Sequence, residues 1–98
     1  MNATMTYCGL RLTERAFDRI VLNHLRACSR DPYARRSRDR WMDVSVYQVG
    51  RSMYDRWQSR YWARIREALM RLCRQGYARR DGGCVEVFFV TAKGRRAR

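Results

Sequence analysis

The chain has 98 residues, with 22 lysines and arginines against 9 aspartates and glutamates, and a formal net charge of +13. This length suits one small domain, in which roughly two thirds of the unfolded chain's surface can be buried, and argues against a second domain. No apolar run approaches the roughly 18 residues of a membrane span, and the N-terminus lacks the apolar block of a signal peptide. We therefore expect a cytoplasmic protein, in a host cell if it is viral, with no membrane partner.

Nearly all of the positive side chains are arginines. The planar guanidinium group binds phosphate bidentately and stacks on bases, which favours nucleic acid as the partner. A GC-rich genome would also raise the arginine content of every protein it encodes. A charge this large on so short a chain still repels itself unless a polyanion is bound. The composition therefore predicts a nucleic-acid-binding protein.

The first helix is predicted to follow a short N-terminal extension. Residues 1–12 mix small, polar and apolar side chains, and we expect them to be extended or poorly ordered. Thr13 is typical of a helix N-cap, and Glu14 would complement the helix dipole in the first turn. An apolar stripe at helical spacing then predicts a helix ending near Ser29. The stripe consists of Phe17, Ile20, Val21, His24, Leu25 and Cys28.

The middle of the chain is predicted to be a basic loop followed by a short helix. Residues 29–40 contain the only proline and the run from Arg35 to Arg40, which lacks apolar periodicity and indicates a solvated loop able to contact phosphate. Residues 41–44 suit a short strand or an entry segment, and Ser45 can cap the helix that follows. The predicted inner face of that helix holds Val46, Val49, Gly50 and Met53.

A longer basic helix is predicted over residues 59–75. Residues 54–58 lack helical periodicity and indicate a turn, so Ser59 or Asp55 would cap this helix. Gly76 would end it, because glycine adopts positive φ without a Cβ penalty. The buried stripe is predicted to be Tyr61, Ile65, Ala68, Leu69 and Leu72. The outward face is predicted to hold Ser59, Ala63, Arg66, Glu67, Met70 and Arg74.

A β-hairpin is predicted after this helix. Its strands would be residues 77–80 and 84–90, closed by the three-residue loop Asp81-Gly82-Gly83. Residues 91–98 would leave the sheet as a basic tail. The predicted organisation is thus an N-terminal extension over residues 1–12, one domain over residues 13–95 and a basic tail over residues 96–98.

This order of elements, three helices and then a hairpin, is that of a winged helix-turn-helix domain, an α+β fold. Two motifs also resemble this family over about residues 44–95. Ile65, Leu69, Leu72, Gly76 and Tyr77, followed by Arg79-Arg80-Asp81-Gly82, are similar to a recognition helix that runs into its wing. The segment Val90-Thr91-Ala92-Lys93-Gly94-Arg95 is similar to the Leu-Thr-x-x-Gly-Arg ending of the wing's return strand in MarR-like and PadR-like regulators.

The resemblance implies that the third helix enters the major groove of double-stranded DNA. Its base-contacting residues would be Arg60, Ala63, Arg66 and Glu67. Arg66 is the first choice for guanine, because a bidentate arginine on O6 and N7 is the commonest specific contact. The DNA backbone would be contacted by Arg56, Gln58, Ser59, Arg35, Arg36, Arg38, Arg79 and Arg80.

Cysteine and histidine give weaker signals. The four cysteines, Cys8, Cys28, Cys73 and Cys84, are too widely spaced for a zinc finger, and we expect free, mostly buried thiols. Disulfides become plausible for a hyperthermophile or its viruses, and three full pairings then stay open. His24 and Cys28 have a metal-ligand spacing, but such residues on an apolar stripe are more often core residues. We therefore expect no metal, cofactor or small-molecule ligand, and the absence of a catalytic grouping predicts no enzyme.

The sequence thus predicts a sequence-specific DNA-binding regulator of transcription, most simply a repressor, acting as a homodimer. Leu22 and Met70 fall on the outward faces of their helices, which hints at an apolar surface for dimerisation. Two alternatives stay open. The same fold could bind an acidic host protein on behalf of a virus or mobile element, which makes a viral or archaeal source a candidate, or the basic loop could bind RNA.

Overall fold

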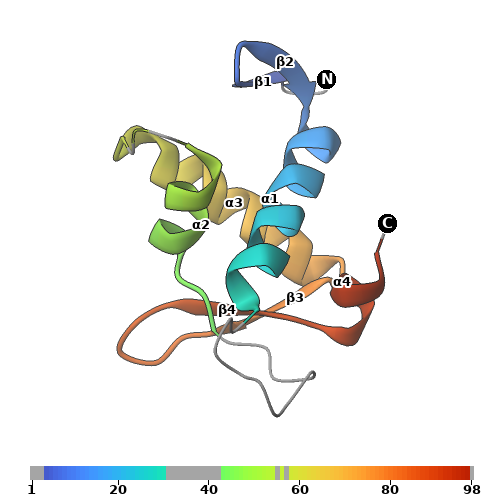
Figure 1. The fold of residues 1–98 in the computed structure, drawn as a ribbon. Helices are drawn as coiled ribbons and strands as arrows, with labels where there is room; N and C mark the ends of the chain where they lie inside the picture. Colours follow the sequence, from blue (N-terminus) through green and yellow to red (C-terminus); the bar gives the residue numbers. More distant parts are fainter. Residues whose placement is uncertain (1–3, 31–42, 55, 57, 98) are drawn as a thin grey trace.

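The structure, a computed structural model, describes residues 4–30, 43–54, 56 and 58–97. Its helices are α1 (Glu14–Ser29), α2 (Val46–Met53), α3 (Arg60–Arg74) and α4 (Ala92–Arg96), and its strands are β1 (Thr4–Tyr7), β2 (Leu10–Thr13), β3 (Ala78–Asp81) and β4 (Val87–Val90) (Figure 1). The described chain is therefore a small α+β fold with four helices and two antiparallel hairpins. The expected class is confirmed, but the expected count of three helices and one hairpin is wrong.

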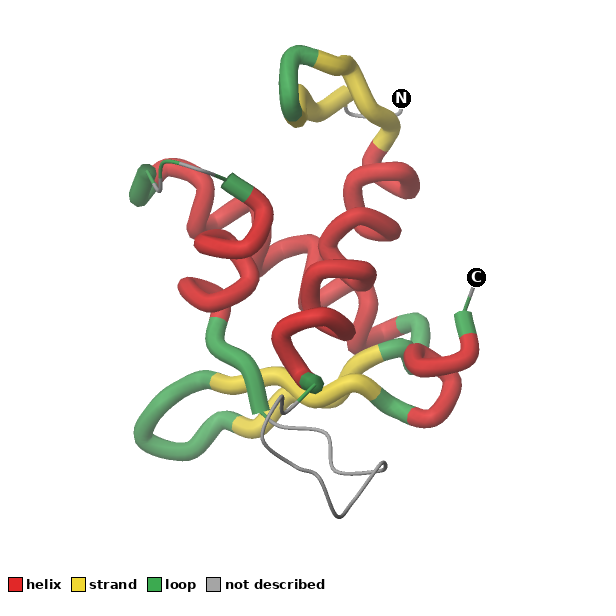
Figure 2. The backbone as a smooth tube through the Cα atoms, in the orientation of Figure 1, coloured by secondary structure: helices red, strands yellow, loops and turns green. Residues whose placement is uncertain are grey.

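The two hairpins lie at opposite ends of the molecule. The β3–β4 sheet runs beneath α1, α2 and α3, whereas the β1–β2 hairpin stands above them at the start of α1 (Figure 2). α1, α2 and α3 form the layer between the hairpins, and α1 packs on both α2 and α3. None of the helices that the structure describes combines the length and the apolar character needed to cross a membrane.

Residues 4–13 form a hairpin, which the sequence did not predict. An extended segment was one of the two expectations for the N-terminus, but the pairing of Tyr7 with Leu10 closes it into a two-residue turn. Cys8 and Gly9 both have positive φ, 52° and 77°, as a type I′ hairpin turn requires. Cysteine rarely adopts this conformation, so of the two turn residues only Gly9 indicated a turn in the sequence. The Tyr7 hydroxyl anchors the hairpin by donating to the Met53 carbonyl at 2.8 Å.

The predicted caps of the first two helices are confirmed. The Thr13 hydroxyl accepts from the amide of Ala16 at 3.1 Å, and α1 ends at Ser29 as expected. The Ser45 hydroxyl accepts from the Gln48 amide at 3.2 Å, while the Gln48 side chain accepts from the Ser45 amide at 2.8 Å. This reciprocal capping box satisfies two amides that the helix itself leaves unpaired.

The third helix ends as predicted but begins differently. Ser59 stands at the N-cap with helical torsion angles and makes no side-chain capping bond, so its predicted role is wrong, and Asp55 lies outside the described residues. At the other end Gly76 has a φ of 83°. The amide of Tyr77 donates to the carbonyl of Leu72 at 2.9 Å, and that of Gly76 to Cys73 at 3.1 Å. These two bonds form a Schellman motif, which only a residue tolerant of positive φ can close.

The β3–β4 loop is longer than predicted. Asp81 pairs with Val87, so the loop spans residues 82–86 instead of the expected residues 81–83. Val44 forms a bridge with Phe88 through two backbone hydrogen bonds of 2.9 and 2.7 Å. A short strand was expected over residues 41–44. Of this segment the structure describes only Asp43 and Val44, and Val44 makes the strand-like contact. The register of β4 is thus set by pairing on both of its edges.

The expected basic tail is instead the helix α4, and this prediction is wrong. The Thr91 hydroxyl accepts from the Gly94 amide at 3.1 Å and caps the helix. Gly94 is buried against the backbone of Tyr77. The guanidinium of Arg26 donates to the carbonyl of Ala97 at 2.6 Å and ties α1 to the end of α4. The helix therefore runs across the boundary predicted between residues 95 and 96.

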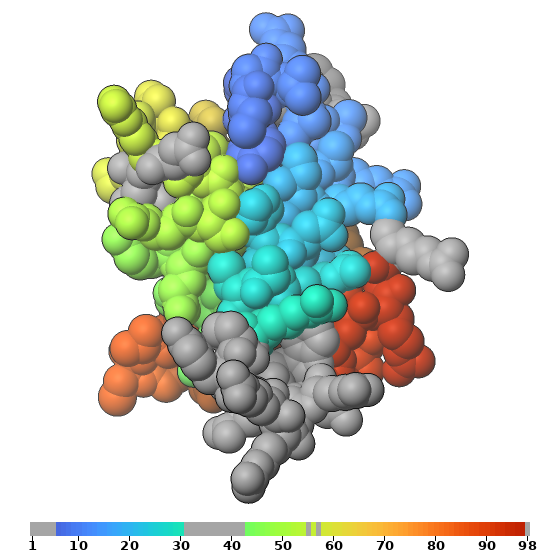
Figure 3. Space-filling model, viewed as in Figure 1, coloured from blue at the N-terminus to red at the C-terminus, as the bar shows by residue number. Residues whose placement is uncertain are grey.

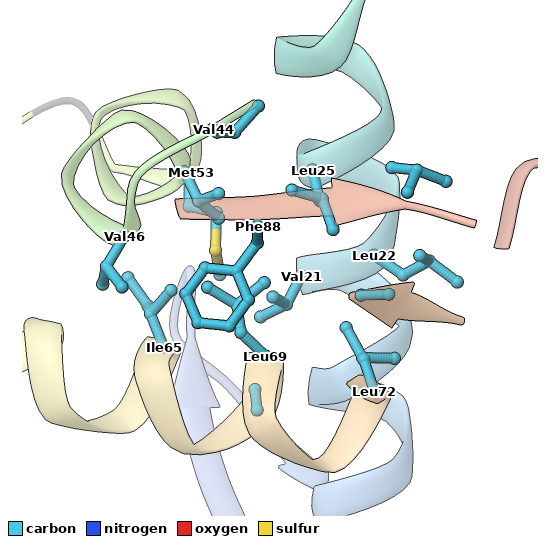
Figure 4. Packing of buried hydrophobic residues seen from close by; sticks show 14 of the residues in the cluster. Val21, Leu22, Leu25, Val44, Val46, Met53, Ile65, Leu69, Leu72 and Phe88 are labelled. Atoms are coloured by element: carbon cyan, nitrogen blue, oxygen red, sulfur yellow. The ribbon is translucent and has the colours of Figure 1, made fainter. Parts of the chain in front are cut away.

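The core lies between the helices and the β3–β4 sheet. The ring of Phe88 projects from β4 toward Ile65 and Leu69 of α3 and Val21 of α1 (Figure 4). The predicted stripe of α3 is confirmed, with Ile65, Ala68, Leu69 and Leu72 buried and Tyr61 half-buried. Leu22 corrects an expectation, since its side chain is 5% exposed and belongs to the core. Met70 is half-buried against the core, so neither residue forms the outward apolar surface that was expected.

Candidate nucleic-acid interface

The structure brings most of the predicted site residues to the N-terminal half of α3. Arg60, Ala63 and Glu67 are exposed, and Arg66 is half-buried toward the β3–β4 loop. Arg56, Gln58 and Ser59, all exposed, precede the helix. Arg79 and Arg80 are exposed on β3, whose loop stands out from the helical body (Figure 3). The remaining predicted contacts, Arg35, Arg36 and Arg38, lie outside the described residues.

Arg66, the residue expected to read guanine, is held by a carboxylate that the sequence did not suggest. Its Nε and Nη2 atoms donate to the two carboxylate oxygens of Glu86 at 2.8 and 3.0 Å. Arg80 donates from Nε to the same carboxylate at 2.6 Å. One glutamate of the β3–β4 loop thereby holds an arginine of α3 and an arginine of β3 together. The two guanidinium groups and one carboxylate keep a net charge of +1.

These contacts shift the pKa values of both partners. The hydrogen bond from Arg66 lowers the pKa of the Glu86 carboxyl, with a further lowering by Arg80, because both stabilise the charged form. The hydrogen bond to Glu86 raises the pKa of Arg66, so this guanidinium stays charged. Glu86 is thus a carboxylate throughout the neutral range.

Acidification should therefore release the β3–β4 loop from α3. Because the folded state lowers the Glu86 pKa below its unfolded value of about 4.5, its stabilising contribution is present above that value and is lost as the pH falls through the folded pKa. We expect wild-type stability to fall more steeply than that of Glu86→Gln between about pH 5 and pH 3, a window that begins just above the unfolded pKa and extends below it, as measured by urea denaturation. Parallel pH profiles for the two proteins would contradict the contact.

Several other arginines of the interface make no ion pair within the described residues. Arg60, Arg64 and Arg74 are exposed on α3, and Arg79 places its guanidinium 5.0 Å from the ring centroid of Phe89. Arg64 was missed in the sequence, although its spacing of four residues from Arg60 puts both on one helix face. By contrast, Arg71 donates two hydrogen bonds to Asp18 of α1, at 2.8 and 2.7 Å, and its side chain is largely buried.

Two exposed aromatic or apolar side chains flank the Arg66 contact. Trp62 is 43% exposed, and the Arg66 guanidinium carbon lies 5.8 Å from the centroid of its ring. Val85, beside Glu86 in the β3–β4 loop, is 67% exposed. The ring of Trp62 therefore packs on one side of the guanidinium while Glu86 holds its edge, and both contacts fix the direction in which Arg66 points.

The thiols follow the expectation in part, and His24 and Cys28 contact polar groups of α2. All four cysteines are free, but Cys8 and Cys84 are exposed, so the prediction of mostly buried thiols is wrong for these two. His24 and Cys28 are half-buried; the His24 Nδ1 lies 2.7 Å from the Ser52 hydroxyl, and Cys28 donates to the Gln48 carbonyl at 3.7 Å. Burial lowers the pKa of His24. Within the described ranges, no group of three or more histidine, cysteine or acidic side chains is placed to hold a metal ion.

No protein-family profile, no curated protein and no solved structure matches this chain.

Proposed function

We propose that the protein binds double-stranded DNA as a winged helix-turn-helix regulator of transcription, with α3 in the major groove and the β3–β4 loop beside it on the backbone. One observation carries this proposal. The exposed half of α3 places small Ala63 near Arg60 and Arg64, which make no ion pair within the described residues. It also places Ala63 near Arg66, whose cluster with Glu86 and Arg80 keeps a net positive charge. A polyanion can therefore approach the helix closely and meet positive charge.

The arrangement of the other elements supports the proposed docking. α1, α2 and α3 are followed by the β3–β4 hairpin, and Val44 pairs with the strand that returns from the loop. This is the order of a winged helix-turn-helix domain, in which the third helix and the wing lie side by side on DNA. The contact of Glu86 with Arg66 links these two elements directly.

Glu86 also suggests how Arg66 would read a base. Its carboxylate occupies the edge of the guanidinium formed by Nε and Nη2, and the edge formed by the two terminal nitrogens stays available. That edge matches the O6 and N7 acceptors of guanine. Arg66 therefore keeps the role expected from the sequence, and Glu86 joins it as the residue that fixes its orientation.

Dimerisation remains part of the proposal, because paired half-sites are the usual targets of such domains. Leu22 gives it no support, since this side chain is in the core. Among the described residues, the large apolar side chains exposed away from α3 and the β3–β4 loop are Leu10 and Tyr47, with exposures of 64% and 50%. A dimer would have to form over one of these regions or over residues outside the described ranges.

A gel-shift series over several salt concentrations tests the proposal. Duplex DNA should bind more tightly than single-stranded DNA or RNA, with a log–log salt slope of about 0.9 per neutralised phosphate. Arg66→Ala should weaken a preferred sequence by about 1–3 kcal/mol and relax preference at one base pair, whereas Arg79→Ala with Arg80→Ala should weaken all sequences alike. Absence of duplex binding at low salt contradicts the function, and an unchanged preference in Arg66→Ala contradicts the docking face.

A further inference from the structure

A cleft of about 680 Å³ opens between the N-terminal hairpin and the start of α3. The turn residues Cys8 and Gly9 form one wall, and Met53 and Tyr54 at the end of α2 form the second. Arg60 and Arg64, one helical turn apart on α3, line the third. The elements that line this cleft lie at the end of the molecule that carries the N-terminal hairpin, away from the β3–β4 sheet (Figures 1 and 2).

The lining is positively charged and contains no carboxylate among the described residues. Both arginines are exposed, and neither makes an ion pair within the part of the chain that the structure describes. Arg60 donates a long hydrogen bond of 3.3 Å to the hydroxyl of Tyr61, which leaves most of its donors unused. The cleft therefore offers two guanidinium groups to an anion and, among the described residues that line it, no competing negative side chain.

Without a bound anion, Arg60 and Arg64 lie in an electrostatically unfavourable position. The N-terminus of a helix carries a partial positive charge, which Glu14 complements in the first turn of α1. α3 has no acidic residue in its first turn and begins instead with Arg60, whose charge is repelled by the helix dipole. The like charge of Arg64, one turn further along, also repels Arg60. A bound anion would remove both repulsions.

Aromatic contacts make the cleft rigid. The rings of Tyr54 and Tyr61 stack with centroids 4.2 Å apart and an interplanar angle of 11°. Tyr7 meets Tyr54 edge-on at 5.4 Å, and its hydroxyl is bound to the Met53 carbonyl. These contacts join the hairpin to α2 and α3, so the walls are already in place before a ligand binds, and a small anion loses little by having to order them.

We propose that this cleft is a phosphate-binding site, with Arg60 and Arg64 as the residues that hold the phosphate oxygens. The phosphate belongs either to a DNA backbone or to a free phosphorylated small molecule, since both present the same oxygens to a pair of guanidinium groups. The site does not depend on the proposed DNA docking, because it needs only a phosphate group, and it gives Arg60 a phosphate contact in place of the base contact expected from the sequence.

Nuclear magnetic resonance titration with inorganic phosphate at constant ionic strength tests the site directly. Saturable shifts should appear at the backbone amides of Cys8, Gly9, Arg60 and Arg64. The variant Arg60→Gln with Arg64→Gln should raise the dissociation constant about tenfold or more, because two charge-assisted contacts are lost.

The chain contains a matched control. Arg15 and Arg19 form another exposed arginine pair four residues apart, on α1, but carboxylates of Glu14 and Asp18 lie beside them. Arg15→Gln with Arg19→Gln removes the same charge and should leave phosphate binding within about twofold. Shifts that do not saturate, or an equal loss in both double variants, would overturn the site.

Duplex binding by Arg64→Gln then identifies the source of the phosphate. A fall of about 0.9 in the log–log salt slope assigns the cleft to the DNA backbone. An unchanged slope, with phosphate binding lost, assigns it to a free phosphorylated molecule. If the wild-type protein binds no duplex, the DNA proposal fails, but the phosphate titration still shows whether the cleft binds phosphate.

Discussion

Replacing Asp18 by alanine is expected to destabilise the protein by about 3 kcal/mol, as measured by urea denaturation at pH 7. The Asp18 and Arg71 side chains are 7% and 14% exposed and form a bidentate ion pair between α1 and α3. Without Asp18, the guanidinium would stay largely buried and lose its main partner. The cost falls at the lower end of the range for broken buried pairs, because Glu14 lies 3.4 Å from Arg71 and compensates in part.

A double variant separates this explanation from simple loss of packing. Asp18→Leu with Arg71→Met removes both charges, so we expect it to recover most of the lost stability. Arg19→Ala, a change at an exposed neighbour, should stay within about 0.5 kcal/mol of wild type. A double variant as unstable as Asp18→Ala would show that the unpaired charge is not the cause.

Gly94→Ala is the second change with a large expected effect, a destabilisation of about 3 kcal/mol. A Cβ at this position would lie 2.0 Å from the carbonyl oxygen of Tyr77 and 3.0 Å from Cγ1 of Val90. The backbone must therefore shift or α4 must detach. In an open helix the same change would stabilise by about 1 kcal/mol, so the sign of the result depends on the close contact.

Thermal unfolding measures this difference. In a domain of this size a loss of about 3 kcal/mol lowers Tm by roughly 10 °C or more. Gly83→Ala is the matched control, because a Cβ there would meet only the Asp81 carboxylate at 3.9 Å. The control should unfold within about 3 °C of wild type. A Gly94→Ala protein as stable as the control would contradict the close approach of α4 to Tyr77.

Local signals in the sequence predicted the helices well, and they failed where the structure depends on distant contacts. Thr13, Ser45 and Gly76 each act on residues a few positions away, so their capping roles could be predicted. The β3–β4 loop ends at the start of β4, Val87, and the next residue, Phe88, pairs with Val44, a partner from another part of the chain. For the same reason the basic ending of the chain did not reveal α4, which depends on contact between Gly94 and Tyr77.

The candidate site was likewise predicted where it depends on local helical spacing and missed where it depends on distant contacts. Helical periodicity placed Arg60, Ala63 and Glu67 on the exposed face of α3, where the structure has them. Periodicity could not reveal that Glu86 would hold Arg66, because the two are 20 residues apart and meet only through the loop. Nor could it place Leu22, whose burial comes from packing of α1 that a single helical wheel does not contain.

The tie between Arg26 and Ala97 has a consequence for synthesis of the protein. These residues are 71 positions apart, and the pair of Asp18 with Arg71 is separated by 53. α1 is therefore synthesised well before its partners α3, β4 and α4. Its apolar stripe stays exposed to solvent in the nascent chain until these elements emerge from the ribosome, so this core can close only after α4 has been made.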